Sequence, residues 1–184
     1  KIARATSVMT SIRPIYTWLE EFGIFRDRAG TSFDEQSTYM AGILIEYWRA
    51  LKAVVPGAFS APDDYVIQKT PGLFALHMIL RDRLLPRIYH GRRDWDQETF
   101  EEFLGVSPEI TDHAFWGSTE NRASAYGSMK GFRDLADLLN DSLDPDQLNR
   151  VSVTYNNGEY FVRIRPQSAK RKSPWVLSPG AFFW

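Results

Sequence analysis

The spacing of apolar residues along this chain predicts a series of amphipathic helices. Apolar side chains recur every three or four positions over residues 4–25 and again over residues 32–54, and this is the period of an α-helix. Pro14 lies inside the first segment, where a proline predicts a kink or the start of a second segment. The pattern loosens over residues 23–30, which indicates a connection between the two helices.

The boundaries of the second helix have their own sequence signals. Ser32 and Glu35 have the spacing of a capping box, which marks a helix start. Pro56-Gly57 marks its end, because proline and glycine both interrupt a helix. Residues 57–64 are rich in proline, glycine and alanine, and we expect a loop there.

The most apolar helical segment begins near Pro71 and ends before Pro86. Thr70 suits the N-cap position, and Pro71 suits the first helical position because its missing N–H would have no partner there. Apolar residues cover much of the circumference of this segment, which predicts a buried central helix. Gly72 in its first turn indicates the close approach of another backbone segment or of a ligand.

Three further helices are predicted in the second half of the chain. They cover residues 96–104, 107–116 and 128–143, and the last of them has a clear apolar face. Between the last two, residues 117–127 form a predicted polar loop.

The C-terminal part follows a different pattern. Apolar and polar residues alternate on both sides of Asn156-Asn157-Gly158, and this combination predicts a β-hairpin. A basic connector and an apolar end follow, and we expect them to dock on the rest of the protein. The predicted fold is therefore mainly α, with a helical domain of about six helices over residues 1–148 and a β-hairpin with a basic tail over residues 149–184, an α+β arrangement.

Composition sets limits on this picture. Hydrophobic residues make up 43% of the 184 residues and aromatic residues 14%, so a core can be buried and global disorder is not expected. The chain has no cysteine, which excludes disulfides, zinc–thiolate sites and cysteine nucleophiles. No apolar run reaches the about 18 residues that span a membrane, and no signal peptide precedes the first helix. We therefore expect a cytoplasmic protein without a membrane partner, and Lys1 at the start suggests that an N-terminal part, itself an expected partner, is missing.

Charge is balanced in total but unevenly distributed. Lysine and arginine number 22, and aspartate and glutamate 23. Two basic groups stand out: Arg81, Arg83, Arg87, Arg92 and Arg93, and then Arg163, Arg165, Lys170, Arg171 and Lys172. Acidic stretches over residues 94–112 and 134–146 separate them, so one face can be basic although the sum is not, and a basic face predicts contact with DNA. The alternative is a set of solvated helix ends and surface ion pairs, each of which contributes little.

Two helix starts have the residue types of an anion site. Lys69, Thr70 and Gly72 stand at the start of the apolar helix, but no glycine precedes Lys69 at P-loop spacing, which excludes a Walker A motif. A simpler phosphate site at a helix N-terminus stays possible there, and a second one at Ser128 and Lys130. In each case the alternative is an ordinary capped helix.

The histidines predict no catalysis. His77, His90 and His113 have no histidine or glutamate at metal-ligand spacing, and no G-x-S-x-G motif accompanies them. His77 stands in the apolar helix, where a histidine with its hydrogen bonds satisfied is expected. We predict no catalytic residue, no metal and no cofactor.

A winged helix, with residues 128–143 as the recognition helix and the hairpin as the wing, is a further alternative. The order of elements fits it. Asp134, Asp137 and Asp141 do not, because they would repel the phosphate backbone.

The order of several short motifs resembles that of a known family. The segments are EYWRALKAVVPGAF, YVIQKTPGLFALHMILRD, AFWGS and GSMKGFRDLADLL, and the matching residues are Tyr47, Trp48, Pro56, Lys69, Thr70, Gly72, Phe115, Trp116, Gly127, Lys130 and Gly131. Together, over about residues 4–143, they resemble the C-terminal region of proteins with the Asp-Gly-Gln-His-Arg (DGQHR) domain, a family that includes the repressor-like protein of DNA phosphorothioation systems. The DGQHR string itself is absent, so the resemblance implies a DNA-linked bacterial or phage protein without implying a catalytic site.

These observations combine into one expectation and two alternatives. We expect a non-catalytic module of a DGQHR-like protein, linked to DNA modification, phage defence and transcription regulation, that binds DNA or a partner protein through its basic groups. The first alternative is a nucleotide- or phosphate-binding enzyme domain that uses the two helix starts. The second is an oligomerisation or protein-interaction domain, because the aromatic content is high enough to leave an exposed aromatic patch.

Overall fold

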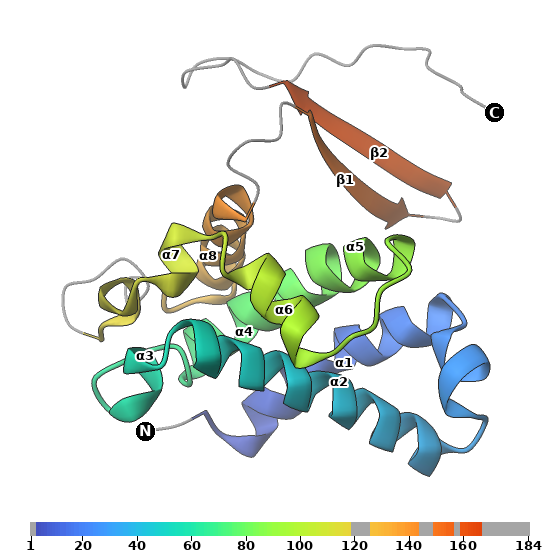
Figure 1. Ribbon diagram of the computed structural model, residues 1–184, viewed down its shortest axis with the longest axis horizontal. Coiled ribbons are helices and arrows are strands. Elements are labelled where there is room, and N and C mark those ends of the chain that lie inside the picture. Colours follow the sequence, from blue (N-terminus) through green and yellow to red (C-terminus); the bar gives the residue numbers. More distant parts are fainter. Residues whose placement is uncertain (1–2, 119–125, 144–148, 157–158, 167–184) are drawn as a thin grey trace. The chain divides into compact units, whose positions relative to one another are not determined.

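The computed structural model describes residues 3–118, 126–143, 149–156 and 159–166, and for the last two ranges the backbone alone (Figure 1). The chain divides into two compact units, Lys1–Pro145 and Asp146–Trp184. The described part of the first unit is mainly α-helical, as predicted, and it has eight α-helices where about six were expected.

The bounds of the helices follow the chain order. The α-helices are α1 (Ala5–Glu21), α2 (Phe33–Val54), α3 (Gly57–Ser60), α4 (Thr70–Ile79), α5 (Leu85–His90), α6 (Gln97–Leu104), α7 (Pro108–Thr111) and α8 (Met129–Ser142). Two π-helical turns, η1 (Phe25–Ala29) and η2 (Leu80–Leu84), and the 3₁₀ turn η3 (His113–Trp116) complete the unit.

Helix α4 is the centre of the hydrophobic core. It contacts α1 and α8, while α2 packs along α6 (Figure 1). Leu76, Ile79 and Leu80 are completely buried, and Gly72 to His77 are buried without interruption. The prediction of a buried central helix in this segment is confirmed. A helix that is apolar around its circumference can only be stable when other elements cover it on every side.

The start of α2 confirms the predicted capping box. The Glu35 backbone N–H donates to the Ser32 hydroxyl at 3.3 Å, and the Ser32 N–H donates to the Glu35 carboxylate at 3.1 Å. These two bonds satisfy backbone donors that have no partner inside the helix. The Ser32 hydroxyl, which donates to the Glu35 carboxylate at 2.7 Å, and then the Ser32 N–H lower the pKa of Glu35.

Pro86 does not end the central helix, contrary to the prediction. The helical path continues from α4 through η2 into α5. A proline cannot donate a hydrogen bond, and its ring clashes with the carbonyl four residues earlier in a regular α-helix. The chain avoids this by widening one turn, so that the Leu85 N–H donates to the Leu80 carbonyl five residues earlier.

Other boundaries also differ from the prediction. Helix α1 continues through Pro14, so no second segment starts there, and α3 occupies part of the predicted loop over residues 57–64. The predicted helix over residues 107–116 is divided into α7 and η3, because the Asp112 carboxylate accepts from the Ala114 N–H at 2.9 Å and starts a new turn.

The second unit has two described strands, β1 (Asn149–Asn156) and β2 (Glu159–Pro166). They pair antiparallel, with Val153 opposite Val162 and Asn156 opposite Glu159. The placement of this unit against the helical unit stays a prediction, and residues 167–184, including the basic tail, lie outside the described residues.

Candidate functional site

The basic residues predicted to bind DNA fall in different parts of the chain. Arg81 lies in η2, Arg87 in α5, and Arg92 and Arg93 in the loop between α5 and α6. Arg163 and Arg165 belong to β2, of which only the backbone is described, and Lys170, Arg171 and Lys172 lie outside the described residues. Only the first group can therefore be examined as a site.

Arg87 and Arg93 stand over one aromatic ring. The centre of the Arg87 guanidinium lies 4.6 Å from the centroid of Phe103, and that of Arg93 lies 5.6 Å from it. Cation–π contacts of this length hold a guanidinium in place. We call Arg87, Arg92, Arg93 and Phe103 the arginine cluster.

Carboxylates partly balance the cluster. Glu102 accepts from Arg93 at 2.8 Å. This hydrogen bond lowers the pKa of Glu102, and the positive charges of Arg93 and Arg87 lower it further. Asp96 and Glu98 also raise the pKa of Arg93, after the larger effect of Glu102. The arginines therefore stand just before the acidic stretch over residues 94–112.

Arg92 differs from its neighbours in backbone and exposure. Its φ is 54°, in the left-handed region that side chains other than glycine seldom adopt, and it is the only non-glycine residue with a positive φ in the described part of the chain. The residue is exposed at the turn after α5. Its backbone N–H donates to the Tyr89 carbonyl at 3.0 Å, which holds the turn in this shape.

Arg81 forms a separate pair. Its Nη2 donates to the Asp82 carboxylate at 2.7 Å, and this hydrogen bond raises the pKa of Arg81. The guanidinium is thus matched by a carboxylate on the neighbouring residue. Of the predicted residues in the first group, the structure brings together Arg87 and Arg93, with Arg92 next to Arg93 in the loop.

The helix start at Lys69 uses its polar groups within the chain. Lys69 is the N-cap residue, one position before the predicted Thr70, and it makes no side-chain capping bond. Its ammonium donates to the Asp63 carbonyl at 2.6 Å. A Cβ at Gly72 would lie 2.5 Å from the Val66 carbonyl oxygen, so the predicted close approach is confirmed and its partner is the preceding segment of the chain. Anion binding by Lys69, Thr70 and Gly72 stays a prediction.

The second helix start has an ordinary cap. The Ser128 hydroxyl accepts from the Gly131 N–H at 3.1 Å, which confirms the alternative of an N-cap at the start of α8. Lys130 is exposed in the first turn. A phosphate site formed by Ser128 and Lys130 stays a prediction.

His77 belongs to a buried chain of hydrogen bonds. Trp48 Nε1 donates to His77 Nε2 at 3.0 Å, His77 Nδ1 is 2.8 Å from the Ser11 hydroxyl, and that hydroxyl donates to the Val8 carbonyl at 2.8 Å. Since Nε2 accepts, the neutral imidazole carries its proton on Nδ1. Both ring nitrogens of His77, Trp48 Nε1 and the Ser11 hydroxyl therefore each have a hydrogen-bond partner. Burial lowers the pKa of His77 to about 4. The prediction of a satisfied core histidine is confirmed.

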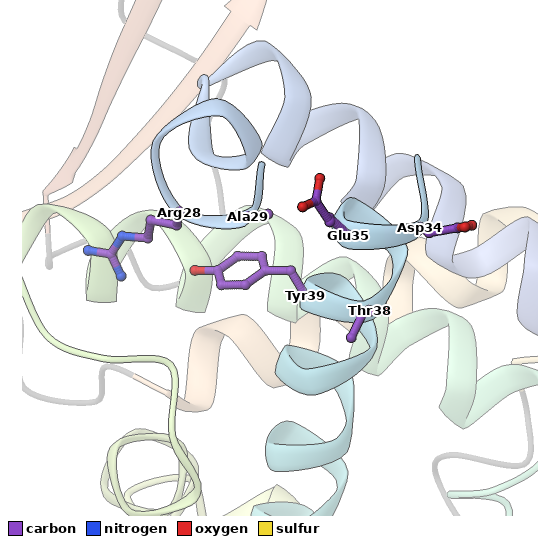
Figure 2. A pocket seen from close by; sticks show the side chains of 6 residues that line it. All are labelled: Arg28, Ala29, Asp34, Glu35, Thr38 and Tyr39. Atoms are coloured by element: carbon purple, nitrogen blue, oxygen red, sulfur yellow. The ribbon is translucent and has the colours of Figure 1, made fainter. Parts of the chain in front are cut away.

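An open pocket that the sequence did not indicate lies at the start of α2. It has a volume of about 410 Å³ and is lined by Arg28, Ala29, Asp34, Glu35, Thr38 and Tyr39 (Figure 2). The Tyr39 hydroxyl points toward Arg28, whereas Asp34 points away from the ring. Glu35 is already engaged by the capping box. The walls of this pocket come from η1 and the first turns of α2, which follow each other in the chain.

The described residues include neither a cluster of metal ligands nor a membrane-spanning helix. Among the described residues, no three histidine, aspartate or glutamate side chains gather as metal ligands would. None of the described helices combines the length and apolar character needed to cross a membrane.

Comparisons with known proteins provide no identification. No family model, no curated protein and no solved structure matches this chain.

Proposed function

We propose that this chain is a non-catalytic helical module that binds DNA through the arginine cluster. The observation that carries the proposal is the placement of Arg87 and Arg93 over the single ring of Phe103. Two like charges held on one ring repel each other. A phosphate group that binds between them would relieve this repulsion.

Stacking on a ring also prepares a guanidinium for phosphate. The ring covers one face of the planar group, and the edge of a guanidinium can make two parallel bonds to phosphate oxygens. Because the ring already restricts the side chain, less conformational entropy is lost when a phosphate binds. Lysine in the same positions would offer a point charge without this geometry.

The acidic residues that follow define how a duplex would approach. Asp96 and Glu98 stand at the start of α6, and they would repel a phosphate backbone that lay along this helix. The proposed contact therefore runs over the end of α5 and the turn at Arg92. Arg163, Arg165, Lys170, Arg171 and Lys172 would supply further phosphate contacts from the second unit, as the sequence predicts.

We further propose that the chain derives from a DGQHR-like protein associated with DNA modification. The support for this is the order of the short sequence motifs. Tyr47, Phe115 and Trp116 among the motif residues are buried, and Gly72 is the close-packed glycine of α4. These residues would preserve the packing of a common fold, so the binding function has to be tested separately.

The direct test is fluorescence anisotropy with a short DNA duplex over a series of salt concentrations. We expect the logarithm of the affinity to fall with the logarithm of the salt concentration, by ~0.9 for each phosphate contact. The double variant Arg92→Ala/Arg93→Ala should bind more weakly at low salt and have a slope smaller by about 2. Circular dichroism should show the same fold.

A matched control is Arg13→Ala. It removes an exposed arginine from α1 and should leave the affinity nearly unchanged. Equal affinity of the wild type and the double variant would contradict the assignment of the arginine cluster. No binding by the wild type at low salt would contradict DNA binding itself and would favour a protein partner.

A further inference from the structure

A third arginine stands over an aromatic ring, at Trp95 of the α5–α6 loop. Arg28 belongs to the π-turn η1, and its guanidinium centre lies 5.3 Å from the centroid of the Trp95 ring. Its side chain is 38% exposed. Trp95 is in turn buried against Tyr39 and Tyr89 at ring distances of 6.3 and 6.4 Å, so the platform beneath Arg28 is rigid.

Arg28 also has an acidic neighbour, but a loosely held one. Its Nη1 lies 4.0 Å from Asp94, whose side chain is 87% exposed, whereas Arg93 lies 2.8 Å from Glu102. An ion pair this long and this exposed is weak and is screened by salt. Asp94 can therefore be displaced from Arg28 without disturbing the core.

We infer that Arg28 is a further phosphate-binding residue of the same surface, and that Asp94 occupies it when no DNA is bound. The inference rests on the proposed DNA-binding function. Asp94 and Trp95 follow directly after Arg92 and Arg93, so the contacts of Arg28 continue those of the arginine cluster along the loop. The carboxylate of Asp94 takes the place that a phosphate oxygen takes in the complex.

The pocket beside Arg28 gives a ligand room to reach it. The guanidinium stands at one end of the open volume, and the Tyr39 hydroxyl is directed toward it (Figure 2). Burial raises the pKa of Tyr39, so the hydroxyl keeps its proton and can act as a second donor to a phosphate oxygen. Asp34 points away from this end of the pocket and does not oppose an anion there.

The test compares Asp94→Asn with wild-type protein in the same anisotropy titration. The amide keeps the size of the side chain and removes its charge. We expect the affinity at low salt to rise about threefold, the effect of losing a weak surface ion pair. The slope of the salt dependence should become steeper, because in the wild type the displaced Asp94 carboxylate takes up a cation and offsets part of the counterion release at Arg28.

Removing any acidic residue from a DNA-binding surface increases the affinity for DNA. The control therefore has to separate this general effect from the specific release of Arg28. Glu98→Gln removes a charge at the start of α6 that has no described contact with Arg28. In an Arg28→Gln background, the gain from Asp94→Asn should disappear, whereas the gain from Glu98→Gln should persist. This dependence on Arg28 is the result that a nonspecific charge effect does not produce.

The outcomes separate this inference from the proposed function. If the wild type binds DNA and Asp94→Asn binds with equal affinity, or keeps its gain without Arg28, the inference is wrong and the arginine cluster stands. If neither wild type nor Asp94→Asn binds at low salt, both are wrong.

Discussion

The buried polar groups around His77 of α4 and the charged groups at the end of α5 and in the following loop differ in their access to water. In the core, Trp48, His77 and Ser11 form one chain in which each donor has one acceptor. At the surface, Arg87 of α5 and Arg93 of the following loop stand over the ring of Phe103, and Glu102 accepts from Arg93. A polar group buried without a partner is costly, whereas a surface charge can be left to water or to a ligand.

This difference decides which residues we regard as functional. His77 has the chemistry of a catalyst, but its hydrogen bonds are complete and no substrate could replace them without opening the core. The arginines stand at the surface, where an anion can reach them, and the Phe103 ring holds two of them. The following predictions test this distinction, and they run from the largest expected effect to the smallest.

The first prediction concerns the protonation of His77. Burial lowers its pKa from 6.5 to about 4, so between these values the unfolded chain binds a proton that the folded chain does not. The free energy of unfolding should be highest above pH 6.5 and should fall by ~3 kcal/mol as the pH decreases to about 4. Urea unfolding at several pH values measures this.

The matched variant for this prediction is His77→Gln, which cannot titrate. Its stability should stay level between pH 6.5 and about 5. The capping carboxylates Glu35 and Asp96 have pKa values below their ordinary 4.5 and 3.8, so they act at lower pH. A fall of the same size in the variant would show that another group causes it.

The second prediction concerns the packing of Gly72. A Cβ there would meet the carbonyl oxygens of Val66 and Ile67 at 2.5 and 2.6 Å, and backbone atoms cannot rotate away as a side chain can. Gly72→Ala should destabilise the protein by about 2 kcal/mol. In contrast, Gly42→Ala meets no atom within 4 Å and should stabilise α2 by ~0.5–1 kcal/mol. Thermal unfolding of both variants measures these opposite changes. A Gly72→Ala variant as stable as the wild type would contradict the prediction.

The third prediction concerns Ser128, a surface hydroxyl with an assigned partner. Because it accepts from the Gly131 N–H, Ser128→Ala should lower the free energy of unfolding by ~1 kcal/mol. Ser128→Asp keeps an acceptor at the N-cap and should restore the loss. If Ser128→Ala changed phosphate binding but not stability, the anion-site alternative would be preferred.

The fourth prediction concerns Arg92, where stability and binding should move in opposite directions. Glycine tolerates a φ of 54°, so Arg92→Gly should stabilise the fold by ~0.5 kcal/mol and weaken DNA binding. Arg92→Ala keeps the strained backbone, and it should weaken binding without any gain in stability. Chemical unfolding and anisotropy on the same samples test this. A destabilised Arg92→Gly variant would show that the side chain has a structural role.

The core could be predicted from the sequence more fully than the candidate site. The apolar period located α4, the Ser32–Glu35 spacing located a helix start, and the position of Gly72 indicated a close approach. Each of these signals is local, since it depends on residues within one or two turns. The continuation of the helix through Pro86 was missed, because a single widened turn has no period of its own.

The candidate site depends on contacts between distant segments. The sequence showed that arginines cluster near residue 90, but it could not show that Phe103 holds two of them. It gave no sign of Arg28, which lies more than sixty positions before Trp95. A stacked arginine and its ring can lie any number of residues apart in the sequence, so ring stacking produces no periodic pattern.

The widened turn η2 also determines how α5, which follows it, is rotated about the helix axis. A π-turn contains one residue more than an α-turn, and one residue corresponds to a rotation of about 100° around the helix axis. The insertion at Leu80–Leu84 is therefore what turns Ile88 toward the core and Arg87 toward solvent. Losing a single residue from this turn would rotate α5 by about 100° and take Ile88 away from the core, so the length of this short stretch is as much a part of the site as the arginines themselves.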